Sequence, residues 1–148
     1  MKILITGASG RLGSKLVTVM AARGHDVTGA DIVGDQVTRL DIGDFAATQA
    51  LVDRLKPDLI MHPAAWTDVD GCAREPEKAI AINGYGTQHV GLAAAHVGAA
   101  VLHISSNEVF DGKSGRAYRE YDVTNPINPY GYSKWVGERS LVNINPKH

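Results

Sequence analysis

The stretch that decides the fold is Lys2-Ile3-Leu4-Ile5-Thr6-Gly7-Ala8-Ser9-Gly10-Arg11-Leu12-Gly13. Residues 2–6 predict a short buried strand that ends at Gly7, and the apolar spacing through residues 12–22 predicts a helix. Glycines three residues apart between a strand and a helix suit a pyrophosphate: the first permits a tight turn, the second a close backbone approach, and the third close helix–strand contact. We therefore expect this loop to bind a dinucleotide through Gly7, Ser9, Gly10, Arg11, Leu12 and Gly13.

Strand-like and helix-like segments alternate along the rest of the chain. The pattern predicts further strands at residues 25–30, 36–40, 58–61 and 99–104, and further helices at residues 44–55, 76–97 and 130–142. Strands separated by helices pair in parallel through right-handed crossovers. We expect an α/β fold in which residues 1–148 form one dinucleotide-binding domain, a doubly wound parallel (Rossmann) sheet with strand order 3-2-1-4-5. Residues 111–129 are the only long loop in this prediction.

Composition and charge describe a soluble globular domain. The 148 residues include 15 Lys and Arg against 16 Asp and Glu, and 44% are hydrophobic. Because the charges are balanced and scattered, we expect no nucleic-acid partner. No apolar run approaches the roughly 20 residues that span a bilayer, and no signal peptide fits before the first strand, so we expect a cytoplasmic protein without a membrane partner. A single cysteine, Cys72, and widely spaced histidines predict neither an internal disulfide nor a metal site.

Carboxylates at two predicted strand ends are candidate contacts for an adenosine. Asp31 follows the second strand about 20 residues after the glycine loop, where a carboxylate accepts from ribose hydroxyls. The alternative role for Asp31 is that of a turn residue. Asp41-Ile42 follows the third strand, where Asp41 would meet the exocyclic amine of adenine and Ile42 the ring face. For Asp41 the sequence equally allows a helix N-cap.

A second constellation is Tyr130-Gly131-Tyr132-Ser133-Lys134 at the start of the last predicted helix. Tyr130 and Lys134 are four residues apart and so share one helix face, where an ammonium favours the phenolate form of a tyrosine. Such a tyrosine exchanges a proton near neutral pH. Ser105-Ser106 ends the fifth predicted strand, where a hydroxyl can hydrogen-bond a substrate carbonyl. Surface decoration is the alternative reading of a Tyr/Lys pair.

These motifs, in this order, resemble the cofactor-binding half of an extended short-chain dehydrogenase/reductase. Three runs, at residues 62–79, 104–112 and 125–131, are similar to those of dTDP-4-dehydrorhamnose reductases, and the likeness covers nearly the whole chain. The resemblance implies that Ser106 takes the place of the active-site Thr or Ser, that Tyr130 is the acid and that Lys134 holds the nicotinamide ribose. It also implies cofactor contacts at Ala64 and Ala65, and a structural role for Asn83.

Two departures from the family pattern bear on function. Asn107-Glu108 stands where the reductases usually carry Asp-Tyr, and sugar-nucleotide dehydratases place an acidic pair there. Because Asn107 cannot donate the acid proton that an Asp would supply, reduction of a nucleotide-activated 4-keto sugar is favoured over an epimerase or dehydratase reaction. The family also continues into a C-terminal substrate domain, which these residues lack. The remaining alternative is a non-catalytic nucleotide-binding subunit resembling the regulatory subunit of methionine adenosyltransferase.

The cofactor and the oligomeric state follow from two further features. Asp31 would repel a 2′-phosphate whereas Arg11 would pair with one, so we expect NAD(H) to be favoured and NADP(H) to be accepted. The strand at residues 101–105 is expected to have one unpaired side, and the last helix to expose Trp135, Val136 and Leu141. We therefore expect a homo-oligomer.

Overall fold

The computed structural model describes residues 1–148 and contains one parallel sheet in the order β3-β2-β1-β4-β5. Its strands are β1 (Lys2–Thr6), β2 (Asp26–Asp31), β3 (Thr38–Arg39), β4 (Leu59–His62) and β5 (Ala100–His103). The central strand pairs on both sides, with Leu4 opposite Thr28 of β2 and Ile60 of β4. The predicted doubly wound sheet and its strand order are confirmed.

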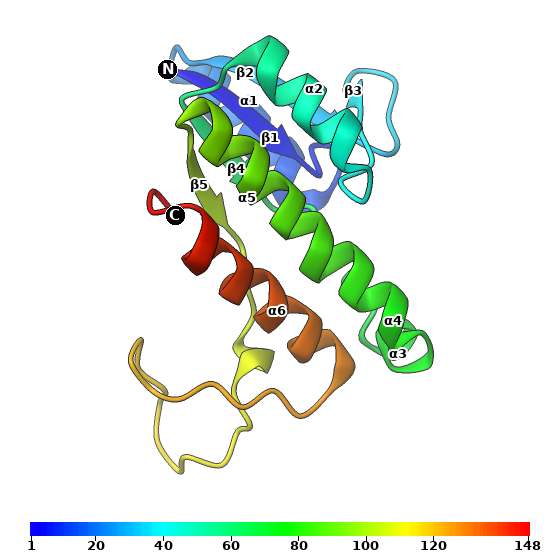
Figure 1. Cartoon of the computed structure of the whole chain (residues 1–148), viewed down its shortest axis with the longest axis vertical. Coiled ribbons are helices and arrows are strands. Elements are labelled where there is room, and N and C mark those ends of the chain that lie inside the picture. Colours follow the sequence, from blue (N-terminus) through cyan, green and yellow to red (C-terminus); the bar gives the residue numbers. More distant parts are fainter.

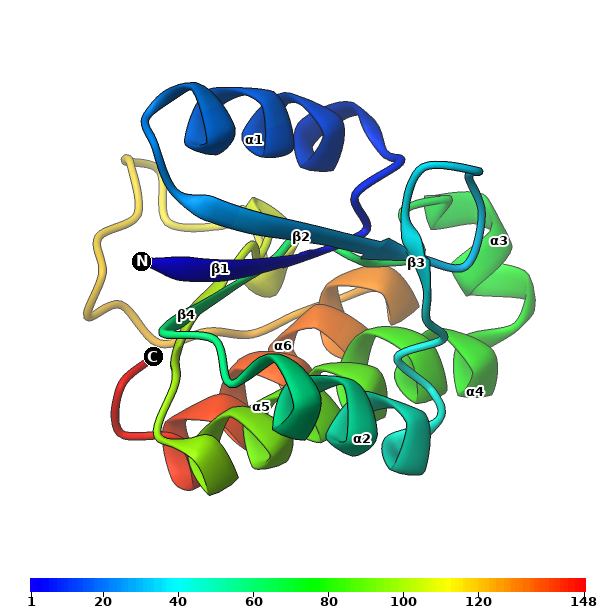
Figure 2. The same cartoon turned by 90° about the horizontal axis from the view of Figure 1, so that it is seen from above.

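Helices cover the two faces of the sheet unequally. Helix α1 (Arg11–Ala22) lies on one face, whereas α2 (Phe45–Leu55), α5 (Gly86–Val97) and α6 (Pro129–Ile144) lie on the other, as Figure 2 shows. Helices α5 and α6 lie side by side (Figure 1). None of the helices combines the length and the apolar character needed to cross a bilayer.

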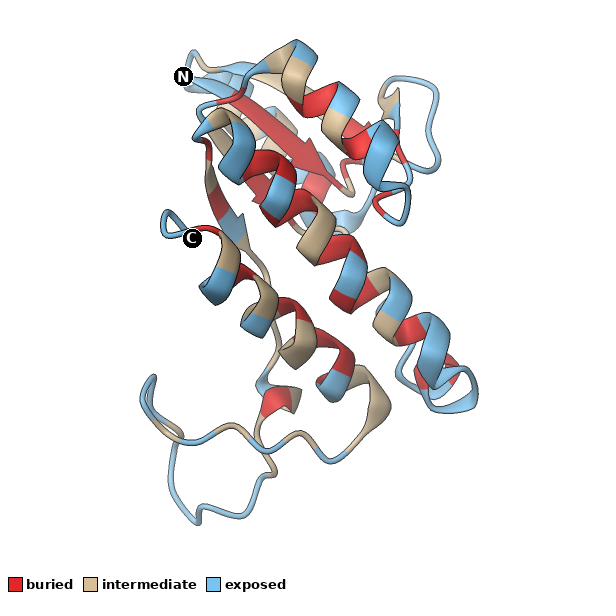
Figure 3. Cartoon of the chain, in the orientation of Figure 1, coloured by how far each residue is buried: buried red, intermediate tan, exposed pale blue.

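The core divides into two layers because β1 is buried on both faces (Figure 3). Ile3 and Ile5 point toward α1, together with Met61 of β4. Leu4 points the opposite way, into a larger cluster that contains residues of α2, α5 and α6. Side chains of a strand alternate between faces, so a continuous apolar run such as that of β1 is typical of a central parallel strand.

The helix predicted at residues 76–97 is three segments. They are α4 (Pro76–Ala79), a π-helical segment η1 (Ile80–Tyr85) and α5. Two glycines lie at this transition: a Cβ on Gly84 would lie 2.8 Å from Val136 of α6, and one on Gly86 would lie 2.8 Å from Ile42. Because these glycines have no side chain, the segment can pack close to Val136 and Ile42. We attribute its π-helical hydrogen bonding to this packing and not to the helix propensity of its residues.

Two short helices were absent from the prediction. Helix α3 (Val69–Arg74) begins after Asp68, whose side chain accepts the N–H of Gly71 at 3.0 Å. A 3₁₀ turn, η2 (Asn107–Val109), begins after Ser106, whose Oγ accepts the N–H of Glu108 at 3.2 Å. Both helices begin with a side-chain N-cap, so the start of each could have been predicted from the sequence.

The expected exposed edge and exposed helix face are partly wrong. The N–H of Val101 donates to the carbonyl of Lys147 at 2.9 Å, so the chain's own C-terminal residues cover the start of the β5 edge. Leu141 is 2% exposed and belongs to the core, and Trp135 donates to Thr124 Oγ1 at 2.8 Å. Part of the α6 face that was predicted to be exposed is therefore buried by packing inside the chain.

Candidate functional site

The glycine loop adopts the geometry that its spacing predicts. Gly7 has a φ of +63°, and a Cβ there would lie 2.8 Å from the backbone of Ala64. A Cβ on Gly13 would overlap the carbonyl of Gly7, which shows how closely α1 approaches β1. Gly10 is the N-cap of α1, and no side chain caps the helix there. The first amides of α1 therefore face the end of the sheet, where a helix N-terminus favours an anion.

Asp31 closes β2 beside this loop. Its Oδ2 accepts the N–H of Ser9 at 2.8 Å, and its Oδ1 accepts the N–H of Ile32 at 2.7 Å. Ser9 Oγ donates in turn to the carbonyl of Val33 at 2.6 Å. The carboxylate thus has the turn role that the sequence allowed and lies beside the glycine loop, where its contact with a ribose stays a prediction.

Asp41 and Ile42 follow β3 on the same edge of the sheet. Asp41 is not the N-cap of α2, because that cap is Asp44, whose Oδ1 accepts the N–H of Ala47 at 3.0 Å. Asp41 instead accepts the N–H of Gly43 at 2.8 Å. Ile42 is 7% exposed and packs its side chain toward α5.

A cavity of about 480 Å³ joins these strand ends. Eight of the predicted cofactor residues line it: Gly7, Ser9, Gly10, Asp31, Asp41, Ile42, Ala64 and Ala65. Arg11, Leu12 and Gly13 do not line it, and neither do Ser106, Tyr130 and Lys134. The residues predicted to contact the adenosine and the phosphates therefore meet in one cavity, and the predicted catalytic side chains do not line it.

Eight further residues of the wall were not predicted. They are Ala30, Ile32, Val33, Leu40, Pro63, Trp66, Lys78 and Ile82. Most of them adjoin predicted residues in sequence, so the signal was available. Lys78 is different: it arrives from α4, where its Nζ lies 4.6 Å from the ring centroid of Trp66 and 3.2 Å from Glu75 Oε1. No local sequence pattern predicted that Lys78 would line this cavity.

The predicted catalytic residues come from η2 and α6, two elements that pack together. Ser106 is the N-cap of η2. Tyr130 is half-buried in the first turn of α6, and Lys134 follows one turn later with 2% of its surface exposed. Burial lowers the pKa of Lys134 to about 8, although Glu138 opposes the shift. Lys134 takes part in none of the chain's ion pairs, so its charge is buried without an anionic partner.

Asn83 joins three elements beneath these side chains. Its Oδ1 accepts the N–H of Trp66 at 2.7 Å, while its Nδ2 donates to Trp66 O at 3.0 Å and to Ser133 Oγ at 2.9 Å. Ser133 donates to the carbonyl of Tyr130 at 2.7 Å. The fully buried amide therefore ties η1 to the loop after β4 and to the first turn of α6, which is a structural role.

The fully buried imidazole of His62 and the half-buried imidazole of His103 lie next to Lys134. Thr87 donates its hydroxyl to Asn83 O at 2.7 Å, so His62 Nε2 donates to Thr87 Oγ1 at 3.1 Å and His62 Nδ1 accepts from Thr6 at 2.6 Å. Burial, and then the neighbouring His103 and Lys134, hold the pKa of His62 well below its usual value. Burial and Lys134 lower the pKa of His103 to about 3. Both rings are therefore neutral at physiological pH, and neither adds a second positive charge beside the ammonium.

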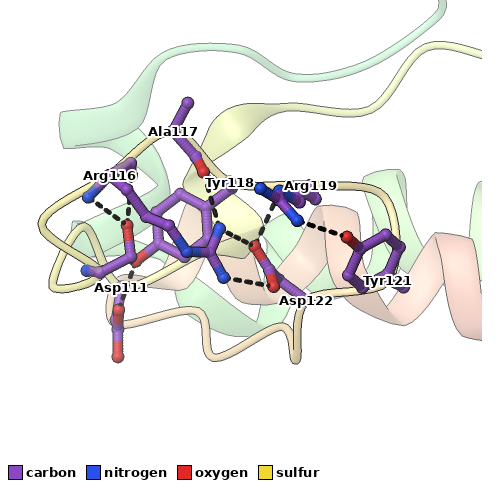
Figure 4. A network of polar contacts seen from close by, with 8 residues as sticks. Asp111, Arg116, Ala117, Tyr118, Arg119, Tyr121 and Asp122 are labelled. Atoms are coloured by element: carbon purple, nitrogen blue, oxygen red, sulfur yellow. Dashed lines mark hydrogen bonds and ion pairs between the residues drawn. The ribbon is translucent and has the colours of Figure 1, made fainter.

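The long loop after η2 is ordered by its own side chains (Figure 4). Asp111 Oδ1 accepts from the Tyr118 hydroxyl at 2.7 Å, and Arg116 forms two bonds of 2.7 and 2.8 Å to Asp122. The Tyr118 hydrogen bond is the main cause that lowers the pKa of Asp111 to about 2. Phe110 stacks on Tyr118 with ring centroids 4.3 Å apart. This loop connects the element that carries Ser106 to the one that carries Tyr130.

The glycine loop, the strand-end carboxylate and the Tyr-x-x-x-Lys helix on a 3-2-1-4-5 sheet define a Rossmann-type domain of the extended short-chain dehydrogenase/reductase class. More specifically, the chain belongs to the family described as RmlD substrate binding domain, which it matches over residues 1–148.

Individual relatives agree with this assignment. A dTDP-4-dehydrorhamnose reductase of Streptomyces griseus is 41% identical over 143 residues, which cover 97% of this chain and 45% of the relative. The crystal structure of a Clostridium acetobutylicum dTDP-4-dehydrorhamnose reductase superposes with a TM-score of 0.93 at 35% identity, covering 99% of this chain and 51% of that one. A Bacillus anthracis dTDP-4-dehydrorhamnose reductase in complex with NADP gives a TM-score of 0.92 at 34% identity, covering 99% and 50%. The chain thus spans about half the length of the relatives that it matches.

Proposed function

We propose that this chain binds a nicotinamide dinucleotide and supplies the proton donor for reducing a nucleotide-activated 4-keto sugar. NAD(H) is the favoured cofactor and NADP(H) is also accepted. The observation that carries the proposal is the cavity at the strand ends, because residues from the glycine loop and from the ends of β2, β3 and β4 meet in its wall. Ligands of doubly wound sheets bind at this carboxyl edge.

The residues present fit such a cofactor. Gly10 borders the cavity, and the nearest atom to a Cβ built on it is the Gly7 carbonyl oxygen, at 3.2 Å. A side chain at position 10 would therefore occupy ligand space, and its Cβ would press slightly on the Gly7 carbonyl. Asp31 and Asp41 supply acceptors at the cavity, and Ile42, Ala64 and Ala65 supply apolar wall.

When bound, the nicotinamide supplies the hydride. Tyr130 donates its phenolic proton to the sugar carbonyl oxygen as negative charge develops there, and Ser106 donates a hydrogen bond to the same oxygen. Lys134 holds the nicotinamide ribose, and its charge favours the phenolate that proton donation leaves behind. The names of the relatives support a dTDP-4-dehydrorhamnose-type substrate.

Titration of the purified chain with NADH and NADPH, followed by calorimetry, tests the binding step. Gly10→Val should weaken binding at least about tenfold, which corresponds to roughly 1.4 kcal/mol. It should destabilise the fold by only about 1 kcal/mol, because valine is a poorer N-cap than glycine. The matched control is Gly24→Ala, in a turn remote from the cavity: Gly24 has a φ of +79°, and a Cβ added there would have no atom within 4 Å.

The control should lose about 1 kcal/mol of stability through left-handed backbone strain and keep its affinity. Equal affinities of wild type and Gly10→Val would refute dinucleotide binding at this loop. Oxidation of NADH that depends on an added dTDP-4-keto sugar would directly support the reductase step, and Tyr130→Phe should remove most of it.

A further inference from the structure

Glu108 connects the element that carries Ser106 to the element that carries Tyr130. Its backbone N–H donates to Ser106 Oγ at 3.2 Å, and its Oε2 accepts from Asn128 Nδ2 at 2.5 Å. Asn128 is the N-cap of α6, and its Oδ1 accepts the N–H of Gly131 at 2.7 Å. One continuous set of hydrogen bonds therefore runs from Ser106 to the first turn of α6.

Backbone contact reinforces this connection. A Cβ on Gly131 would overlap the carbonyl oxygen of Glu108, so η2 and α6 touch through main-chain atoms. Both Glu108 and Asn128 are half-buried, where a hydrogen bond is electrostatically stronger than at the surface. Tyr130 lies between the two helix residues, Asn128 and Gly131, that this contact fixes.

We propose that Glu108 is a positioning residue: through Asn128 it sets the start of α6, and with it Tyr130, relative to Ser106. This inference rests on the proposed function, in which both hydroxyls act on one carbonyl oxygen. It also gives Glu108 of the Asn107-Glu108 pair a role other than acid–base chemistry. Glu108 has one carboxylate oxygen occupied by the scaffold, so it serves as a hydrogen-bond acceptor rather than as the base of an elimination.

The role requires an acceptor and not a negative charge, which makes the conservative variant informative. Glu108→Gln keeps a side-chain oxygen for Asn128, whereas Glu108→Ala removes it. Asn128→Ser gives the same break from the other side, because serine still caps a helix but is too short to keep the bond to Glu108.

The first measurement compares two ligands by calorimetry. ADP probes only the glycine loop and the adenosine cavity, whereas NADH adds the nicotinamide ribose that Tyr130 and Lys134 would contact. Glu108→Ala and Asn128→Ser should each weaken NADH about fivefold, the loss expected for one hydrogen bond, and leave ADP within about twofold. Glu108→Gln should retain the wild-type affinity for both. A general loss of structure would weaken both ligands alike, which would overturn the proposal.

The second measurement needs no ligand. Amide exchange at Gly131 and Tyr132 should be about tenfold faster in Glu108→Ala, relative to Ile60 in the core, and unchanged in Glu108→Gln. Unchanged exchange in Glu108→Ala would overturn the positioning role. So would a Glu108→Gln variant that behaves like Glu108→Ala. If the wild type binds neither NADH nor ADP, the proposed function fails, and the exchange data still decide the role of Glu108 in ordering α6.

Discussion

Replacing Lys134 by methionine should stabilise the chain while it impairs cofactor binding. The side chain is 2% exposed and has no anionic partner in any ion pair of the chain. Methionine has a similar volume and no charge to desolvate, so the core can accept it with little rearrangement. A buried charge that costs stability is expected where a ligand is to be bound.

The size of the effect follows from the pKa. Burial lowers the pKa of Lys134 from 10.5 to about 8, so the unfolded chain keeps this proton over a pH range in which the folded chain has lost it. Stability therefore rises with pH between about 8 and 10.5, because the unfolded state binds more protons there. Below pH 8 the full penalty applies, and at 1.36 kcal/mol per pKa unit it is about 3 kcal/mol.

Urea denaturation of wild type and Lys134→Met at several pH values from 7 to 10 measures this difference. Lys134→Met should be more stable by about 3 kcal/mol near pH 7, or roughly 10 °C in Tm, and the gap should close as the pH approaches 10. Lys15→Met, on the exposed face of α1, is the control and should change stability by less than about 0.5 kcal/mol. A wild type more stable than Lys134→Met near pH 7, or a gap that does not depend on pH, would refute the reasoning.

Two other predictions concern cofactor choice and association. Wild type should bind NADH more tightly than NADPH. Asp31→Ala should shift the ratio of the two dissociation constants toward NADPH, because it removes the carboxylate at the glycine loop. A tenfold wild-type preference for NADPH would contradict this prediction. The chain should self-associate in sedimentation experiments through the part of β5 that Lys147 leaves uncovered, where Leu102 is 41% exposed, and Leu102→Lys should shift it toward monomer. A monodisperse wild-type monomer would count against this surface.

The fold was predictable because its decisive signals are local. A run such as Lys2–Thr6 is buried on both sides in a parallel sheet, and Gly7 after it has a conformation that few other residues adopt. Alternating strands and helices then leave few topologies, since crossovers are right-handed. The same reasoning explains why half of the residues that line the cavity were predicted: they belong to the glycine loop or follow directly after strands.

Features that depend on contacts distant in sequence were missed. The π-helical segment exists where Gly84 and Gly86 let Val136 and Ile42 approach, and the helical periodicity of residues 76–97 contains no sign of it. The start of the β5 edge is covered by Lys147, which lies beyond the whole of α6 in the chain, and no pattern predicts its bond to Val101.

Glu108 illustrates why residue type alone does not fix a role in the site. An acidic side chain next to the active-site hydroxyl indicates either sugar contact or acid–base chemistry, and both depend on the carboxylate facing the substrate. The direction in which the Glu108 carboxylate points is decided by Asn128, 20 residues later in the chain. The amide of Asn128 donates to this carboxylate while its oxygen caps α6. Once Asn128 lies there, turning Glu108 toward the substrate would leave a half-buried amide donor without its partner, at a cost of about 1–3 kcal/mol. The same hydrogen bond that removes Glu108 from the chemistry therefore makes the position of Tyr130 depend on it.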